Sequence, residues 1–230
     1  MASVPCTLAS AVIWTRLAGG DEATALLVIL LTNCTSWLTT TAWLVWGAGA
    51  EGVSLSAGPM MGRLALVLVL PVAVGQGLRA AGPLRRLATD YRVPLGVVAR
   101  LLTLAIMLKA ALEVRLRLDG DRAELGLASL AGVAAACLGL HLAALFAGLW
   151  SSRGLGFDRG RQIAVAIAGS QKTLPVSLIL FDAYFARDYA LAVIPMAFYH
   201  VGQLVADTWI ADRLAGKRLK EAEMPEDPVV

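Results

Sequence analysis

The chain has 230 residues, of which 58% are hydrophobic and 16% are charged, and its mean hydropathy is +0.70. Soluble domains carry about a quarter charged residues, so this composition predicts a membrane protein and argues against a soluble globular domain. The formal net charge is only +3, and the arginines are scattered between apolar runs without interleaved aromatic residues, so nothing indicates nucleic-acid binding.

The apolar runs predict an all-α membrane protein, because a spanning helix needs about 20 consecutive apolar residues. The first run, residues 7–17, is too short and lies between Pro5 and a glycine pair, so it is interpreted as a half-helix. Six full spans are expected at residues 23–46, 61–78, 93–112, 125–150, 163–181 and 189–210. Pro71 lies inside the second of these and predicts a kink there.

The span at residues 163–181 contains its own interruption, Gly169-Ser170-Gln171-Lys172-Thr173-Leu174-Pro175. A lysine near a bilayer centre costs at least about 2.5 kcal/mol, so it usually faces a cavity or a partner. Gly169 lacks a Cβ and Pro175 lacks an N–H, so one helix is expected to become two half-helices between them. Unwound backbone survives in a membrane only where it lines a wet, protein-enclosed site, so the stretch is a candidate binding site.

A second interrupted segment, Pro5-Cys6-Thr7-Leu8-Ala9-Ser10, combines a proline, hydroxyls and a break in the same way. Short, broken segments at corresponding places in two halves of a chain are typical of inverted-repeat transporters. The interpretation divides the chain into the end of a first repeat at residues 1–50, a complete second repeat at 51–212 and a charged tail at 213–230.

Orientation follows from the loops that carry the lysines and arginines. Arg16, the loops at residues 79–92 and 153–161, and the tail hold more of them than the alternate loops do. Because basic loops stay in the cytoplasm, the C-terminus is predicted to be cytoplasmic, and the cell membrane is the expected location.

The motifs resemble those of the bile acid:sodium symporter-like proteins over nearly the whole chain. Residues 5–12 with 19–23 look like the fourth, broken helix of that family, 70–79 are similar to the sixth, 169–175 to the ninth and 199–204 to the tenth. The Gly-Ser-Gln-Lys-Thr sequence points to the SBF-like branch. The resemblance implies ten helices in two inverted five-helix repeats, whose fourth and ninth helices cross beside the ion and substrate sites.

The same resemblance implies that the chain lacks the three to four N-terminal helices. We expect a start codon assigned too late, a truncated gene, or a separate chain that supplies the missing helices.

Four positions depart from the sodium-coupled members of that family. Their glutamate before Gly-x-Gln is Ile167 here, their asparagine after the fourth-helix serine is Ala11, and two hydroxyl ligands in the next helix are Ala25 and Ile29. These side chains offer no oxygen to a sodium ion, so a carrier that is not sodium-coupled is expected.

Lys172 is interpreted as the replacement for the ion, with its ammonium against the carbonyls that end the first half of the broken helix. The lysine and the positive end of the second half-helix, at residues 173–176, predict an organic anion as solute. Proton coupling is expected if the lysine loses its proton on desolvation.

Nine residues are candidates for binding the solute or its coupled ion: Thr7, Ser10, Asn33, Ser170, Gln171, Lys172, Thr173, His200 and Gln203. Six of them have a structural alternative. Lys172 would bond only to carbonyls of the broken helix, and the other five would bond neighbouring helices to one another: Asn33, Ser170, Gln171, His200 and Gln203. His141 and Asp207 are assigned such structural roles, Asp207 near the interface.

Three classes of function are compared. An intramembrane enzyme needs clustered carboxylates or a histidine-rich metal set; the two histidines look isolated, so no enzyme, metal or cofactor is expected. A secondary-active transporter, or a fragment of one, is favoured. The alternative is a non-transporting relic or regulatory membrane protein.

Overall fold

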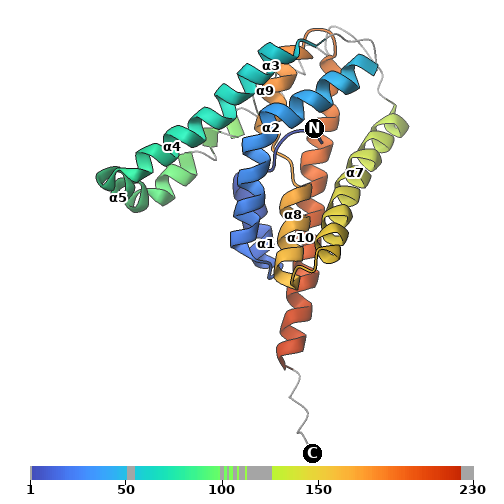
Figure 1. Cartoon of the computed structure of the whole chain (residues 1–230). Helices are drawn as coiled ribbons and strands as arrows, with labels where there is room; N and C mark the ends of the chain where they lie inside the picture. The colour runs from blue at the N-terminus through green and yellow to red at the C-terminus, as the bar shows by residue number, and fades with distance from the viewer. Residues whose placement is uncertain are drawn as a thin grey trace, which may run out of the picture. The chain divides into compact units, whose positions relative to one another are not determined.

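The computed structural model describes residues 2–50, 55–98 and 126–223, together with residues 101, 102, 104, 105, 108 and 112. Helices make up the regular structure of these residues (Figure 1). The all-α prediction is therefore confirmed for the described part of the chain. The span expected at residues 93–112 is described only in part, with residues 92–98 helical.

The chain divides into two compact units. Unit 1 contains residues 1–32, 126–174 and 195–230, and unit 2 contains residues 33–125 and 175–194. The helices of unit 1 are α1 (Leu8–Leu17), the first turns of α2 (Glu22–Ala50), α7 (Leu127–Gly154), α8 (Arg159–Ser170) and nearly all of α10 (Val193–Glu223).

Unit 2 contains the rest of α2, then α3 (Ala57–Leu64), a π-helical turn η1 (Ala65–Val69), α4 (Leu70–Ala80) and α5 (Gly82–Asp90). It ends with α9 (Leu174–Tyr184) and a short 3₁₀ turn η2 (Ala190–Ala192). The π turn lies directly before Pro71, whose ring crowds the carbonyl of the preceding turn and which has no N–H to donate. The kink predicted at this proline stays a prediction, beside the π-helical turn that precedes it.

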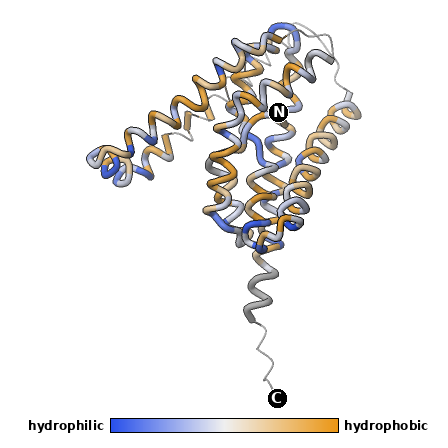
Figure 2. Tube along the Cα trace, viewed as in Figure 1, coloured by the Kyte–Doolittle hydropathy of each residue, from blue (hydrophilic) through white to orange (hydrophobic). Residues whose placement is uncertain are grey.

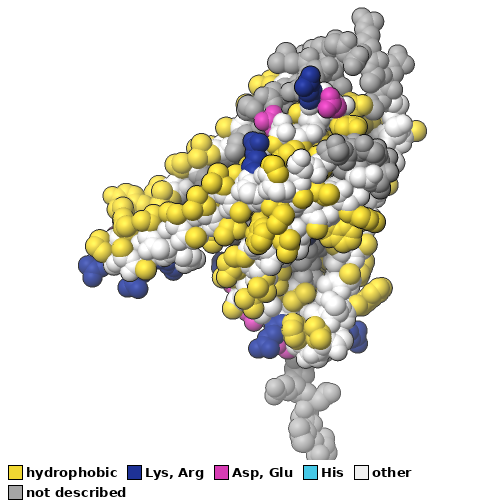
Figure 3. Space-filling view, turned by 45° about the horizontal axis from the view of Figure 1, so that its top comes forward, with side chains coloured by type: hydrophobic (Ala, Val, Ile, Leu, Met, Phe, Trp, Pro, Cys, Tyr) yellow, Lys and Arg dark blue, Asp and Glu magenta, His cyan; other side chains and the backbone are white. Residues whose placement is uncertain are grey.

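Four helical segments are long and apolar enough to cross a membrane: Glu22–Gly47, Ala57–Ala80, Leu127–Gly154 and Arg159–Tyr184. Hydrophobic residues dominate these helices in Figure 2. In the face shown in Figure 3, hydrophobic side chains cover much of the surface, and Lys and Arg gather near the helix ends. Side chains of this kind on the outside of a bundle are expected where lipid is the solvent.

The last expected span, residues 189–210, is not among those four segments. It is helical as α10, but its apolar run is interrupted by His200, Gln203 and Asp207. These polar residues lower the hydropathy of the helix, and two of them, Gln203 and Asp207, are fully buried.

The tight turn between α1 and α2 packs against the start of α8. Gly20 has no room for a side chain, because an added Cβ would lie 2.7 Å from Thr15 Cγ2 and 2.8 Å from Ile163 Cγ2. The close approach lets the Asp21 N–H donate to the Gly160 carbonyl at 2.9 Å. This contact holds the start of α2 against the start of α8.

Asp21 also caps α2. Its carboxylate accepts hydrogen bonds from the Thr24 backbone and hydroxyl and from the Ala23 N–H. These hydrogen bonds hold the pKa of Asp21 below its ordinary value, and the bond from the Thr24 N–H has the largest effect.

Helices α7 and α8 pack directly against each other. A Cβ added to Gly148 of α7 would lie 3.1 Å from Ala166 Cα and 3.2 Å from the Val165 carbonyl oxygen, both in α8. The glycine therefore lets two backbones approach more closely than side chains would allow, as is common between helices in membranes.

Candidate functional site

The predicted break in the ninth-helix motif is present. Helix α8 ends at Ser170 and α9 begins at Leu174, so residues 171–173 are unwound. The N–H of Thr173 donates to the carbonyl oxygen of Pro5 at 3.0 Å. The two interrupted segments, which lie at opposite ends of the sequence, therefore meet through their backbones.

Gln203 of α10 binds the unwound backbone at Lys172. Its Oε1 accepts from the Lys172 N–H at 2.8 Å, and its Nε2 donates to the Lys172 carbonyl at 2.9 Å. Buried peptide groups that leave a helix need such partners. Gln203 is itself fully buried, and its Nε2 lies 3.1 Å from His200 Nδ1 on the same helix.

A tyrosine of α10 supplies a third bond to the break, since the Tyr199 hydroxyl donates to the Ser170 carbonyl at 3.2 Å. The hydroxyl of Ser170 itself donates back to the Ile167 carbonyl at 3.1 Å. Side chains of α10 thus hold the backbone of the break, and the Lys172 side chain takes no part in these hydrogen bonds.

Lys172 is half-buried, and its Nζ donates to the Gly169 carbonyl at 3.0 Å. That carbonyl lies in the last turn of α8, where the helix dipole favours a cation. The ammonium is therefore held at the break itself.

A line of side-chain hydrogen bonds runs from α1 through the break to α7. The Ser10 hydroxyl donates to Gln171 Oε1 at 2.8 Å, and Gln171 Nε2 donates to Asp207 Oδ2 at 2.6 Å. The other carboxylate oxygen, Asp207 Oδ1, lies 3.0 Å from His141 Nε2. We call these four residues the buried relay. Gln171, Asp207 and His141 in it are completely excluded from solvent.

This relay corrects two expectations. His141 is not isolated, because it pairs with Asp207, and the Asp207 side chain does not reach the interface, because it has 0% exposure. Tyr199, Gln203 and Asp207 are four residues apart in sequence, so they lie on one face of a helix. That spacing could have indicated from the sequence that these side chains act together. The sequence gives no such indication for His141, because its partner is on another helix.

The hydrogen bonds of His141 define its tautomer. Its Nδ1 is buried and has no partner among the described residues, and the ring packs edge-on against Tyr199 with centroids 5.9 Å apart. A protonated Nδ1 would bury an unsatisfied donor. An imidazole that donates from Nε2–H to Asp207 and carries no proton on Nδ1 fits this geometry.

Buried apolar side chains occupy the four positions that the family resemblance singles out as departures from its sodium-coupled members. Ala11, Ala25 and Ile29 are at most 1% exposed and pack together with Cys6, Ala164 and Ala168 in one hydrophobic cluster. Ile167, 2% exposed, packs in a second cluster with Ala18, Ile163 and Ala211.

The remaining candidates have different positions. The Thr7 hydroxyl, at the start of α1, accepts from Ser10 at 3.2 Å. Asn33 is buried and belongs to unit 2, where its carbonyl accepts from Ser36 at 2.7 Å. A role for Asn33 at the break stays a prediction.

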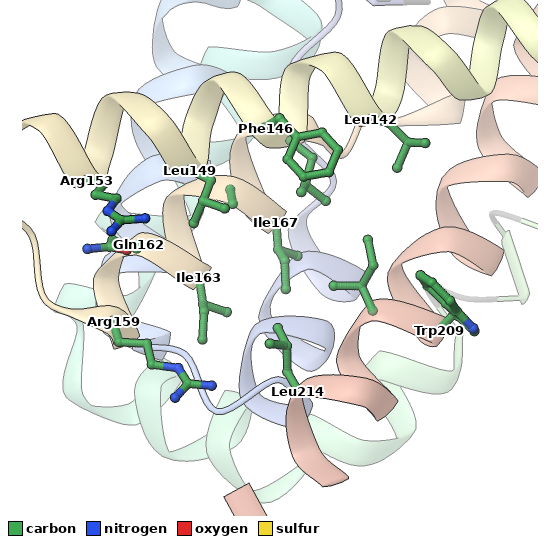
Figure 4. Close-up of a pocket in the computed structure, with 13 residues that line it drawn as sticks. Leu142, Phe146, Leu149, Arg153, Arg159, Gln162, Ile163, Ile167, Trp209 and Leu214 are labelled. Atoms are coloured by element: carbon green, nitrogen blue, oxygen red, sulfur yellow. The ribbon is translucent and has the colours of Figure 1, made fainter. Parts of the chain in front are cut away.

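A separate groove of about 520 Å³ lies between α7, α8 and α10. Figure 4 shows apolar side chains, among them Leu142, Phe146 and Ile167, pointing into it, with Arg153 and Arg159 at one end. Its lining lacks the Lys172 and Gln203 groups of the break. The groove is therefore distinct from the candidate site.

Known proteins are similar to this chain over most of its length. The model of the SBF-like CPA transporter family matches residues 1–216. An uncharacterized protein of Pseudomonas aeruginosa is 26% identical over 222 residues, covering 95% of this chain and 65% of that protein. The probable chloroplastic sodium/metabolite cotransporter BASS4 of Arabidopsis thaliana is 28% identical over 217 residues, covering 89% and 49%.

Sodium/bile acid cotransporter 7 of Danio rerio is 25% identical over 227 residues, covering 93% of this chain and 65% of that protein. The chain thus spans between about half and two thirds of the length of these curated relatives.

Proposed function

The chain belongs to the SBF-like CPA transporter family, and from that premise we propose that it carries a small organic anion by secondary-active transport, without sodium. The family consists of transporters rather than enzymes, and the apolar helices of this chain identify an integral membrane protein. The solute would bind where the two interrupted segments meet.

The position of Lys172 carries the proposal that the solute is an anion. Its peptide is fixed on both sides by Gln203, and its ammonium lies at the break, 3.0 Å from the Gly169 carbonyl. A new helix starts at Leu174, and the free N–H groups of a helix start favour negative charge. A half-buried ammonium beside such a start is suited to a carboxylate or sulfonate.

The hydrophobic cluster of Ala11, Ala25 and Ile29 supports transport without sodium. Sodium is a hard cation that needs several oxygen ligands. Methyl and alkyl groups pack against one another in this cluster and offer none. Two of the curated relatives are named as sodium cotransporters, so this proposal separates the chain from them.

The finer architecture is part of the same proposal. Residues 1–50 would end a first repeat, 51–212 would form a second, inverted five-helix repeat, and 213–230 would be a cytoplasmic tail in the cell membrane.

Uptake by proteoliposomes tests the proposal. Radiolabelled pyruvate and taurocholate would serve as a small and a large organic anion, each in sodium and in choline buffer. We expect equal uptake in both buffers. Loss of a hydrogen bond to a charged group costs about 1.5–3 kcal/mol, so Lys172→Met and Lys172→Gln should each reduce uptake by about tenfold or more.

Arg79→Met is the matched control, because Arg79 is exposed on α4 and far from the break in sequence. Wild-type uptake in both lysine variants would refute the role of the charge, and uptake that requires sodium would refute sodium independence. A protein that exchanges neither anion across the membrane would favour the non-transporting, regulatory alternative.

A further inference from the structure

Asp207 connects three parts of unit 1 through its two carboxylate oxygens. Oδ1 lies 3.0 Å from His141 Nε2 on α7, and Oδ2 accepts from Gln171 Nε2 at 2.6 Å in the break. The side chain has 0% exposure. An acidic group inside a membrane protein is costly unless it is paired, and such groups mark proton or ion pathways in transporters.

The charges around the break balance while Asp207 is ionised. Lys172 supplies one positive charge and Asp207 one negative charge, and His141 is neutral because its Nδ1 has no partner within the described chain. Further titratable groups on the packed elements are Cys6 before α1, Cys137 on α7, and Tyr199 and His200 on α10, and the same helices carry Arg16, Arg153, Arg159, Arg161, Asp212 and Arg213 farther along their length. An anion that enters this balanced site meets no net positive charge.

We propose that Asp207 takes up one proton with each anion, and that this proton reverses the Gln171 amide and so transmits the charge state of Asp207 to Ser10. The inference rests on the proposed function and names its coupling ion. A hydronium ion of the surrounding water transfers one proton to Oδ2: its O–H bond breaks, an O–H bond forms at Oδ2, the hydronium becomes water and the carboxylate becomes a neutral acid.

The hydrogen-bond geometry requires the amide to turn. In the ionised state, Gln171 donates from Nε2 to Asp207 and accepts at Oε1 from Ser10. A protonated Oδ2 carries an O–H donor, and an amide oxygen is a far better acceptor for it than an amide nitrogen, so Oε1 replaces Nε2 at that position. Nε2 then faces Ser10 and donates to it.

Ser10 changes its hydrogen-bond partner in consequence. Its single hydroxyl proton lies within reach of two acceptors, Gln171 Oε1 at 2.8 Å and Thr7 Oγ1 at 3.2 Å. Once Gln171 donates, the Ser10 proton turns to Thr7. Protonation therefore reverses the bonds at the junction of the two segments and leaves Lys172 as the net charge that attracts the anion.

Asp207, rather than His141, receives the proton. A proton on His141 would have to occupy Nδ1, which is buried without a described partner. A proton on Asp207 Oδ2 keeps every bond of the buried relay, since His141 still donates to Oδ1.

Infrared spectroscopy of the purified full chain tests the proton site without any solute. A pH titration should reveal the carbonyl stretch of a protonated carboxylic acid that disappears as the pH rises. This band should be missing in Asp207→Asn and present in Asp212→Asn, which changes an exposed carboxylate one helical turn and a residue further along α10. A band identical in wild type and Asp207→Asn would overturn the proposal.

Gln171→Leu provides a second variant that keeps the carboxyl group. The acid O–H then loses the Gln171 acceptor, so its carbonyl band should move to higher wavenumber. If the carbonyl band of Gln171→Leu stayed at the wild-type wavenumber, the amide would not accept from Asp207, and the proposed reversal of the Gln171 amide would be overturned.

Uptake measurements separate the coupling from the carrier itself. Pyruvate uptake by proteoliposomes should rise with an inward proton gradient in wild type and Asp212→Asn, but not in Asp207→Asn. If wild-type uptake did not depend on the proton gradient, proton coupling would be refuted, while the proposed anion transport would stand. If the infrared band of Asp207 titrates but the chain transports no anion, the proton switch would be supported and the proposed anion transport would be refuted.

Discussion

Replacing Gln203 with leucine is expected to destabilise the break strongly. Leucine has a volume similar to that of glutamine, but it removes both hydrogen bonds to the Lys172 peptide, at 2.8 and 2.9 Å. A buried N–H or C=O left without a partner costs about 1–3 kcal/mol. The two groups together therefore predict a loss of about 2–6 kcal/mol.

Thermal unfolding in detergent measures this loss. For a chain of this size, 1 kcal/mol shifts Tm by about 2–4 °C, so Gln203→Leu should lower Tm by about 4–24 °C. Hydrogen exchange at the Lys172 amide should accelerate at the same time, because the amide loses its acceptor. Both readouts address the same pair of bonds.

The matched control is Gln76→Leu, the same substitution on the exposed surface of α4. Surface changes of this kind usually stay within about 0.5 kcal/mol. If the two leucine variants unfolded at the same temperature, the assignment of the break's stability to the Gln203 amide would be refuted.

Three further predictions concern the packing and capping of unit 1. Gly20→Ala should cost about 1–3 kcal/mol, because the added Cβ would lie within 3 Å of two side chains, whereas Gly75→Ala, in open space, should leave Tm unchanged or raise it. Gly148→Ala should likewise lower Tm relative to Gly139→Ala, since only the former meets the backbone of α8; equal Tm values would contradict the close packing. The depressed pKa of Asp21 contributes stability above its unfolded value of about 3.9 that is lost as pH falls through the folded value. Circular dichroism during acid titration should therefore show a shallower decline for Asp21→Asn, and an unchanged acid limb would argue against this cap.

The sequence predicted the break because the signals are local. Gly169 and Pro175 bracket the unwound residues, and both the missing Cβ and the missing N–H act on their own turn of backbone. The short first helix was predicted for the same kind of reason, since the glycine pair at residues 19–20 ends it, and the structure has α1 at Leu8–Leu17.

The buried relay was not predicted because its signal is not local. His141 and Asp207 are in different helices, and only the packing of α7 against the rest of unit 1 brings Nε2 and Oδ1 to 3.0 Å. An isolated acid and an isolated histidine in two apolar helices read as structural residues when each is considered alone. The polar residues that lower the hydropathy of α10 include two, Gln203 and Asp207, whose side chains are fully buried.

The way Gln203 holds the break has an evolutionary consequence. It contacts the N–H and C=O of residue 172, groups that every amino acid except proline presents identically. The backbone of the break is therefore insulated from the identity of the side chain it displays. A lineage with this scaffold can exchange the lysine for a neutral or acidic residue in one mutational step without rebuilding the membrane fold around it.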